Sequence, residues 1–254
     1  MAAKYFSEKA HVVLAGLNPI LNKLLNDIKF VIESPQVQHL VCVHTHKTLF
    51  HPTLVKVVPH GFTEEDLISN WPRIKDELVA RFPLGLDKEF RIDRYIQILD
   101  CQTIGSYIAV CRSIYPEIEA LLRDEILLED ETWKREWIAK KDSKSRASFQ
   151  SQQINDLIKN KLTGYELANP SATLDEVGVY TAQFIWVLEK SFEKFDPAKL
   201  EDSSRQSFRH LHAHGWSKKA TFIDGLNGLL TYDLALQVVA EKLEKNARAN
   251  EGAI

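Results

Sequence analysis

The sequence predicts an all-α protein, and three observations support that prediction. Apolar residues recur three and four positions apart through most of the 254-residue chain, which is the spacing of one helix face. Alternating apolar and polar residues, which mark half-buried strands, are scarce. Only ten Gly and nine Pro are present, so few positions interrupt a helix. We expect a helical bundle over residues 86–254 and a mainly helical extension over residues 1–85 that packs on it.

The composition is that of an ordinary globular protein, with 44% hydrophobic and 26% charged residues. A formal charge of −3 argues against a protein that coats nucleic acid by bulk positive charge, so any RNA binding must be local. Cys42, Cys101 and Cys111 have no metal-binding spacing and fit reduced core thiols. The sequence has no signal-peptide pattern and no apolar run long enough to cross a membrane, so we expect a cytoplasmic protein.

The first helix is expected over residues 7–33. Its apolar residues form one stripe, which Pro19 interrupts, and Pro35 follows its end. The stripe spans only about three heptads, which favours core packing over a free-standing coiled coil.

Residues 36–62 are ambiguous because they are rich in β-prone valines, and both a short hairpin and a helix remain open. His44, His46 and His51 lie in this stretch. No Cys or carboxylate joins them at a metal-binding spacing, so surface or hydrogen-bonded histidines are favoured over a metal site.

Thr63 begins the next helical pattern, with a cap side chain followed by three acids. Pro72 is expected to break or kink this helix, and Pro83 follows its end. The predicted buried face consists of Leu67, Ile68, Trp71, Ile74, Leu78 and Val79.

Residues 90–128 read as helical nearly throughout, with a kink or a fresh start at Pro116. Glu119 and Arg123 are four positions apart with the acid first, which is the favourable order for a helical ion pair. Simple stabilisation of the helix is one role for this pair, and the orientation of a nearby site is another.

Residues 130–146 hold the main concentration of basic residues, including Lys134 and Arg135 beside Trp133 and Trp137. Basic residues and tryptophans together suit a path for single-stranded RNA, through phosphate contacts and base stacking. A solvated, mobile insertion between helices is the alternative.

Further helices are expected over residues 152–162, 173–195 and 197–214. The last helix is predicted over residues 225–245, with Asp224 as its cap. Its apolar residues cover a wide arc, which indicates a core helix that also faces a dimer partner.

The residues best suited to catalysis lie between Ser204 and Ile223. Arg209 and His214 are five positions apart, Gly215 follows, and His210 lies beside the arginine. Histidine exchanges protons near neutral pH, so His214 could act as general acid or base at a ribose hydroxyl. Arginine grips phosphate and stabilises the charge that develops on it. This pattern suits RNA cleavage without a metal ion.

The arrangement Arg209-x4-His214-Gly215 resembles the Arg-x4–6-His motif of the HEPN superfamily. The stretch from Gly105 through Tyr107 to Arg123 resembles an earlier helix of that superfamily. The resemblance covers roughly residues 90 to 246. It implies a small all-α ribonuclease domain of the kind found in toxin–antitoxin, abortive-infection and other defence systems.

The resemblance also implies a set of site residues. Catalysis is assigned to Arg209 and His214, without a metal or other cofactor. Five positions on an ideal helix rotate by about 140°, so these two residues do not share a face of a straight helix. The superfamily resolves this by dimerisation, which makes the active site composite. Supporting roles fall to His210, Arg205, Glu119 and Arg123.

The candidates for RNA contacts come from the positions of basic residues. Lys218 and Lys219 follow the motif and could hold flanking RNA phosphates or be ordinary surface lysines. Lys134 and Arg135 are the candidates in the basic stretch of residues 130–146.

Three alternatives remain beside a homodimeric endoribonuclease. His210 and His214 share a helix face and could form a metal pair, although no acid or Cys lies nearby. The arginines could instead pair with acids such as Glu201, in a purely structural role. Finally, the domain could bind RNA, nucleotide, an antitoxin or a defence-complex partner without cleaving anything.

Overall fold

The computed structural model describes residues 35–88, 90–128, 131–140, 142, 145 and 219–251. Every regular element within these ranges is helical, which confirms the all-α prediction for this part of the chain. The α-helices are α2 (Pro35–Thr45), α3 (Pro52–Val57), α4 (Glu64–Ser69), α5 (Trp71–Ala80), α6 (Arg91–Thr103), α7 (Tyr107–Leu122), α8 (Glu131–Ala139) and α13 (Phe222–Glu251). Two short turns complete the set: the 3₁₀ turn η1 (Leu84–Leu86) and the π-helical turn η2 (Arg123–Leu127).

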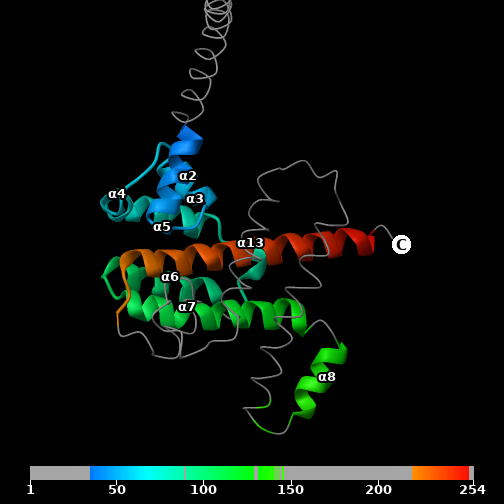
Figure 1. Cartoon of the computed structure of the whole chain (residues 1–254). Coiled ribbons are helices and arrows are strands. Elements are labelled where there is room, and N and C mark those ends of the chain that lie inside the picture. The colour runs from blue at the N-terminus through cyan, green and yellow to red at the C-terminus, as the bar shows by residue number, and fades with distance from the viewer. Residues whose placement is uncertain are drawn as a thin grey trace, which may run out of the picture.

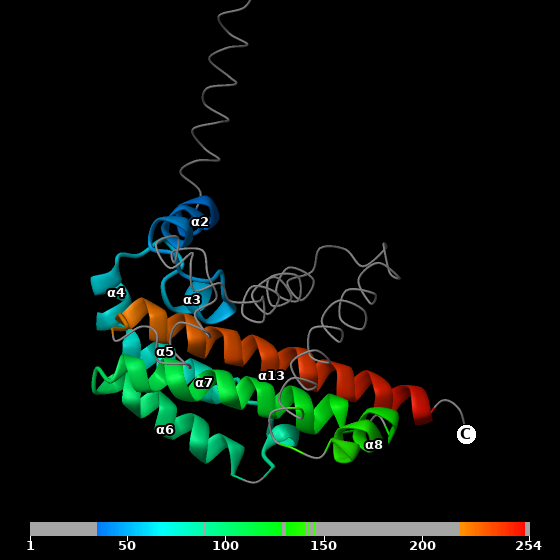
Figure 2. The same cartoon turned by 60° about the horizontal axis from the view of Figure 1, so that its bottom comes forward.

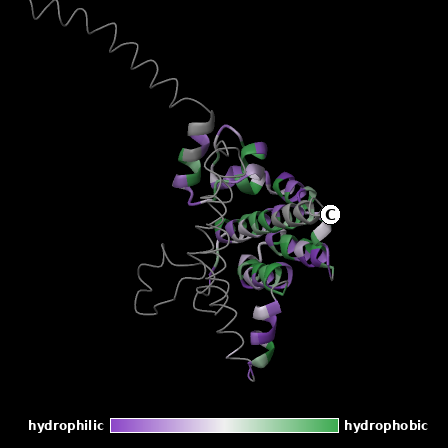
Figure 3. Cartoon of the chain, turned by 90° about the vertical axis from the view of Figure 1, so that its right-hand side faces the viewer, coloured by the Kyte–Doolittle hydropathy of each residue, from purple (hydrophilic) through white to green (hydrophobic). Residues whose placement is uncertain are grey.

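The long helix α13 is the centre of the described fold, and α7 packs along it (Figure 1). The two helices run parallel, because Tyr107 contacts Phe222 near their starts and Ile114 reaches Gly228 further along. Apolar residues run along α13 (Figure 3), as expected for a core helix. The apolar side chains of α13 that are at most 1% exposed are Leu226, Leu229, Leu230, Tyr232, Leu234, Ala235, Leu236 and Val239.

The helices α2 and α3 lie on the opposite side of α13 from α7 (Figures 1 and 2). Helix α5 connects this side to α6, since it contacts both α3 and α6. One hydrophobic cluster extends from Leu54 to Val239. The described part of the predicted extension therefore shares its core with the helices that follow residue 86.

Residues 36–62 form the helices α2 and α3, and not a hairpin. His51 caps α3 by accepting a hydrogen bond from Thr53 N, and Pro52 occupies the first helical position. Val57 and Val58 are buried. Burial of these valines in the core decides the conformation here, against their preference for strands.

The predicted helix start at Thr63 is confirmed, and so is the break at Pro72. The Thr63 side chain accepts from Asp66 N, and the Asp66 carboxylate accepts from Thr63 N, which completes a capping box. The helix is interrupted at Asn70, and Pro72 lies in the first turn of the next helix, α5. Of the predicted buried face, Leu67, Trp71, Ile74 and Leu78 are buried, whereas Ile68 is exposed.

Pro116 does not restart a helix, because α7 continues through it. The break falls earlier, where Gly105 adopts a left-handed φ of +77° and α6 ends. Cys111 is buried in α7, and burial raises the pKa of its thiol to about 12. This cysteine is therefore a protonated core residue.

The last helix starts three residues earlier than predicted, and its cap is Thr221 and not Asp224. The Thr221 hydroxyl accepts from Asp224 N at 3.2 Å, and the Asp224 carboxylate accepts from Thr221 N at 2.7 Å. Asp224 is thus the second member of a capping box. The helices expected over residues 7–33, 152–162, 173–195 and 197–214 lie outside the described residues. None of the described helices is long and apolar enough to cross a membrane.

Candidate functional site

The described residues include only part of the predicted site. Arg205, Arg209, His210, His214 and Lys218 lie outside them. The structure does place the other five candidates: Glu119 on α7, Arg123 on η2, Lys134 and Arg135 on α8, and exposed Lys219 before α13.

The chain is firmly held where the predicted motif leads into α13. Phe222 is 4% exposed, and its ring makes edge contacts with Trp71 and Tyr107 at centroid distances of 6.0 and 5.8 Å. Gln102 Nε2 donates to the Phe222 carbonyl at 2.9 Å. With the Thr221 capping box, these contacts fix the backbone only a few residues after His214 in the sequence.

Glu119 and Arg123 lie at the far end of α7 from this anchor. Tyr107 is the first residue of α7 and contacts Phe222. Arg123 follows Leu122, the last residue of α7. A helix of 16 residues is about 24 Å long. The structure therefore does not bring Arg123 together with Lys219, the nearest described residue to the motif.

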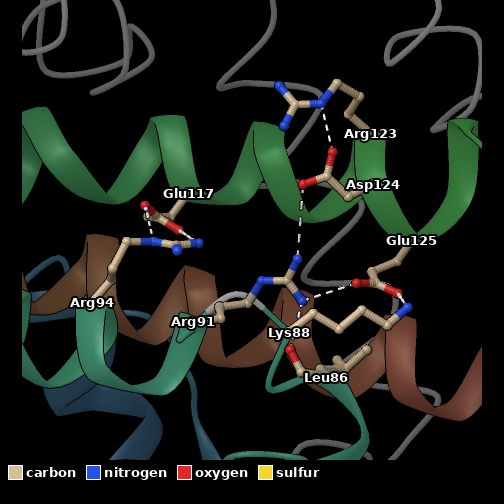
Figure 4. Close-up of polar contacts among 8 residues, drawn as sticks. All are labelled: Leu86, Lys88, Arg91, Arg94, Glu117, Arg123, Asp124 and Glu125. Carbon is tan, nitrogen blue, oxygen red and sulfur yellow. Dashed lines mark hydrogen bonds and ion pairs between the residues drawn. The ribbon is translucent and has the colours of Figure 1, made fainter.

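Arg123 belongs to a network of ion pairs and hydrogen bonds that joins η2 to α6 and to the chain from Leu86 to Lys88 (Figure 4). Its Nε donates to Asp124 Oδ1 at 2.6 Å, and Asp124 Oδ2 lies 3.9 Å from Arg91 Nη2. Arg91 Nη1 donates to Glu125 at 3.0 Å and to the Leu86 carbonyl at 2.7 Å. Lys88 donates to the same Glu125 carboxylate at 2.6 Å.

This network is suited to holding the fold together. Arg91 and Glu125 are each 2% exposed, and a buried charge needs a partner of opposite sign. On the neighbouring turn of α6, Arg94 makes a two-pronged pair with Glu117, at 3.1 and 3.3 Å. The sequence contains no local pattern that indicates these ion pairs, because the partners are 23 to 37 positions apart in the chain.

The basic residues of α8 are also engaged. Lys134 lies 3.4 Å from Glu131, and Arg135 donates to the Glu131 carbonyl at 3.2 Å. Trp133 is 4% exposed and stacks on Trp137 at 5.8 Å with an interplanar angle of 16°. Residues 131–139 form a helix. Because Trp133 is buried, its ring is not available to stack on an RNA base.

A second polar cluster, whose residues were not among the predicted site residues, lies inside the fold. His51 and Asp233 are both 0% exposed, and His51 Nε2 lies 3.1 Å from Asp233 Oδ2. Arg81 Nε donates to the same oxygen at 3.1 Å, and Gln237 donates to the Arg81 carbonyl at 2.7 Å. Asp233 was the detectable signal, because it is a lone acid in an otherwise apolar stretch of α13.

The electrostatics of this cluster follow from its burial. Burial lowers the pKa of His51, and the neighbouring Asp233 offsets only part of that effect. Burial acts to raise the pKa of Asp233, but His51 and Arg81 outweigh it, so the pKa lies below its ordinary value. We infer a neutral His51 beside an ionised Asp233 that is paired with Arg81.

His51, one of the three histidines considered for a metal site, instead contacts Asp233 inside the fold. The part of the chain that the structure describes contains no group of three or more His, Cys, Asp or Glu side chains placed to hold a metal ion.

Comparisons with protein-family models, curated proteins and solved structures find no match to this chain.

Proposed function

We propose that the protein is a metal-independent endoribonuclease. His214 acts as general acid and base at the ribose 2′-hydroxyl and at the leaving oxygen. Arg209 holds the phosphate and stabilises its developing charge. Attack by the 2′-hydroxyl leaves a 2′,3′-cyclic phosphate on one product and a 5′-hydroxyl on the other.

The observation that carries this proposal is the Arg209-x4-His214-Gly215 motif, together with its resemblance to the HEPN superfamily. The all-α fold of the described residues is compatible with it. The contacts of Thr221 and Phe222 also order a described segment that lies close to the motif in the sequence. Glu119, on α7, and Arg123, just after it, keep the supporting roles that the resemblance implies.

The decisive experiment is a cleavage assay with purified protein, cellular RNA and excess chelator. Arg209→Ala and His214→Ala should each abolish cutting, and His44→Ala, at an exposed histidine of α2, should not. Cutting should survive the chelator, and the ends should be a cyclic phosphate and a 5′-hydroxyl. Folded Arg209→Ala or His214→Ala protein that cuts as fast as the parent would refute the proposal.

We further propose a homodimer with a composite active site, which works in a defence or toxin–antitoxin setting. Light scattering should then give twice the chain mass. A mixture of Arg209→Ala and His214→Ala chains should regain part of the activity, because a mixed dimer holds one arginine and one histidine. Failure of the mixture to regain activity, with subunit exchange demonstrated, would contradict a composite site.

The second candidate is a non-catalytic module that binds RNA, nucleotide or a protein partner. The net charge of −3 favours this candidate. The ion pairs of Arg123 with Asp124 and of Lys134 with Glu131 also favour it, because they leave fewer cations to bind RNA. Expression in cells separates the two functions. A ribonuclease toxin should slow growth in a His214-dependent way, and a binding module should not.

A further inference from the structure

Buried histidines hold both ends of the short helix α3. His51 caps its start, and its side chain is fully buried. His39, on α2, is 1% exposed and contacts the carbonyl of Val58, which follows the last residue of α3. Histidine is the side chain whose charge changes most readily near neutral pH. The attachment of α3 thus depends on two groups that acid can alter.

The contacts of His51 leave no place for a second proton. Its Nδ1 accepts from Thr53 N at 3.1 Å, so the ring proton is on Nε2, which faces Asp233. A proton on Nδ1 would face the Thr53 N–H and remove the cap of α3. Arg81 already supplies a positive charge to Asp233 from the end of α5. Among the described residues, Tyr95 also senses the charge of this carboxylate, and Tyr95 is neutral because burial raises its pKa well above the usual value.

His39 is equally restricted. Its Nδ1 lies 3.0 Å from the Val58 carbonyl, which assigns the ring proton to that nitrogen. Its Nε2 is buried and finds no hydrogen-bond partner among the described residues. The rings of Phe50 and Phe62 make edge contacts with it at 5.8 and 5.3 Å. A second proton would place an uncompensated charge among aromatic side chains.

The main packing partner of α3 is α5, and polar contacts link this region to α13. Besides the His51–Asp233 contact, Asn227 of α13 accepts from Leu49 N at 3.0 Å and donates to the Lys47 carbonyl at 2.8 Å. The Asn227 amide does not titrate. Protonation of His51 therefore weakens the link to α13, and protonation of His39 loosens the contact between α2 and the end of α3. The Asn227 contacts and the packing of α3 on α5 remain.

We propose that α2 and α3, residues 35–58, form a latch on α13 that opens when His39 and His51 are protonated. The latch is a conformational device that is independent of the proposed ribonuclease activity. In the open state both histidine rings reach water, so they take up protons below about pH 6.5, the ordinary histidine pKa. In the closed state these protons are excluded. The balance therefore moves towards opening as the pH falls. Burial, which lowers the pKa of both histidines, agrees in direction.

The expected size of the effect follows from the ordinary histidine pKa of about 6.5. A histidine that is barred from protonation when closed, and free when open, raises the opening constant about tenfold between pH 7.5 and pH 5.5. The two histidines together give at most about a hundredfold.

The test is amide hydrogen exchange of the full chain at these two pH values, corrected for the intrinsic rates. Latch amides such as Val55 N and Val58 N should become less protected at pH 5.5, and should exchange faster than amides of α7. The double variant His39→Asn/His51→Gln, which keeps polar groups that cannot titrate, should lose the pH dependence. His44→Gln/His60→Gln, at exposed histidines of the same region, should retain it.

Two outcomes of the exchange experiment would overturn the latch. One is equal protection of latch and α7 amides, which would indicate global unfolding only. The other is an unchanged pH dependence in the double variant. If that variant does not fold, histidine NMR of the parent protein decides. If either histidine ring is protonated at pH 5.5 while the latch amides stay protected, the proposal is rejected. If both rings are neutral in the closed state, the proposal is supported.

Discussion

Asp233 is the residue on which three parts of the molecule depend. Its carboxylate contacts His51, before α3, and Arg81, after α5, while its backbone belongs to α13. A carboxylate without exposure is costly unless it is paired, so these contacts are needed for its burial.

We expect Asp233→Asn to lower the free energy of unfolding by about 3 kcal/mol, because it removes one partner from a buried ionic contact. Glu77→Gln is the control, since its partner Lys56 is largely exposed, and such surface pairs contribute less than about 1 kcal/mol. Urea denaturation followed by circular dichroism measures both. Equal losses for the two variants would argue against a special role for Asp233.

The same carboxylate should give the parent protein an acid-sensitive stability. The pKa of Asp233 is lower in the folded than in the unfolded chain, so its contribution is present above about pH 4 and is lost as the pH falls through the folded value. The amide that replaces this carboxylate in Asp233→Asn does not titrate. The difference in unfolding free energy between parent and variant should therefore shrink below about pH 4 in urea titrations, and a difference independent of pH would contradict the assignment.

The buried Arg91–Glu125 pair gives a second prediction at the residue scale. Arg91→Met leaves Glu125 with Lys88 as its remaining ion-pair partner and should cost about 3 kcal/mol or more. Arg91→Met/Glu125→Leu removes both buried charges and should recover most of that loss. A double variant no more stable than the single variant, by urea denaturation, would mean that the charges themselves are required.

At the scale of the element, capping boxes set two helix starts in different places. Thr63 and Asp66 begin α4, and Thr221 and Asp224 begin α13. The chemistry is the same, but only the second box lies a few residues after the predicted catalytic histidine.

Thr221→Ala and Thr63→Ala should each reduce stability by about 1 kcal/mol through the loss of a cap. Only Thr221→Ala should also slow RNA cleavage, because it loosens the backbone next to the motif. The measurement pairs thermal unfolding with the cleavage assay. Equal cleavage by the two variants would show that the capping box of α13 does not contribute to catalysis.

At the scale of the whole molecule, the shared core joins residues on both sides of position 85. Leu54, Leu67, Ile74 and Leu78 are all 0% exposed and belong to the same cluster as α13. The boundary predicted near residue 85 therefore does not separate two cores in the described part of the chain.

A fragment of residues 86–254 should accordingly unfold at a lower urea concentration than the full chain, with a less cooperative transition. The reason is that removal of α2–α5 exposes apolar residues of α6 and α13 and leaves Asp233 unpaired. Circular dichroism and analytical ultracentrifugation check this expectation. A monomeric fragment with the midpoint of the full chain would show that residues 1–85 are dispensable for the core.

Local patterns predicted much of this fold and little of its internal chemistry. The Thr63 cap, the Pro72 break and the apolar arc of α13 depend on residues close in the sequence, and the structure confirms them. The hairpin alternative failed because burial overrode β propensity. The pairs of Asp233 with His51 and of Glu125 with Arg91 could not be predicted, since no local spacing records a contact between positions so far apart in the chain.

The parallel packing of α7 and α13 also has a consequence for synthesis on the ribosome. Gln102 and Phe222 are 120 positions apart, and α13 follows every other described helix in the chain. At about 5 to 20 residues per second, roughly 5 to 20 s separate the completion of α7 from the appearance of α13. During that time the apolar face of α7 waits for its main partner. The nascent chain should therefore depend on chaperones until α13 has left the ribosome.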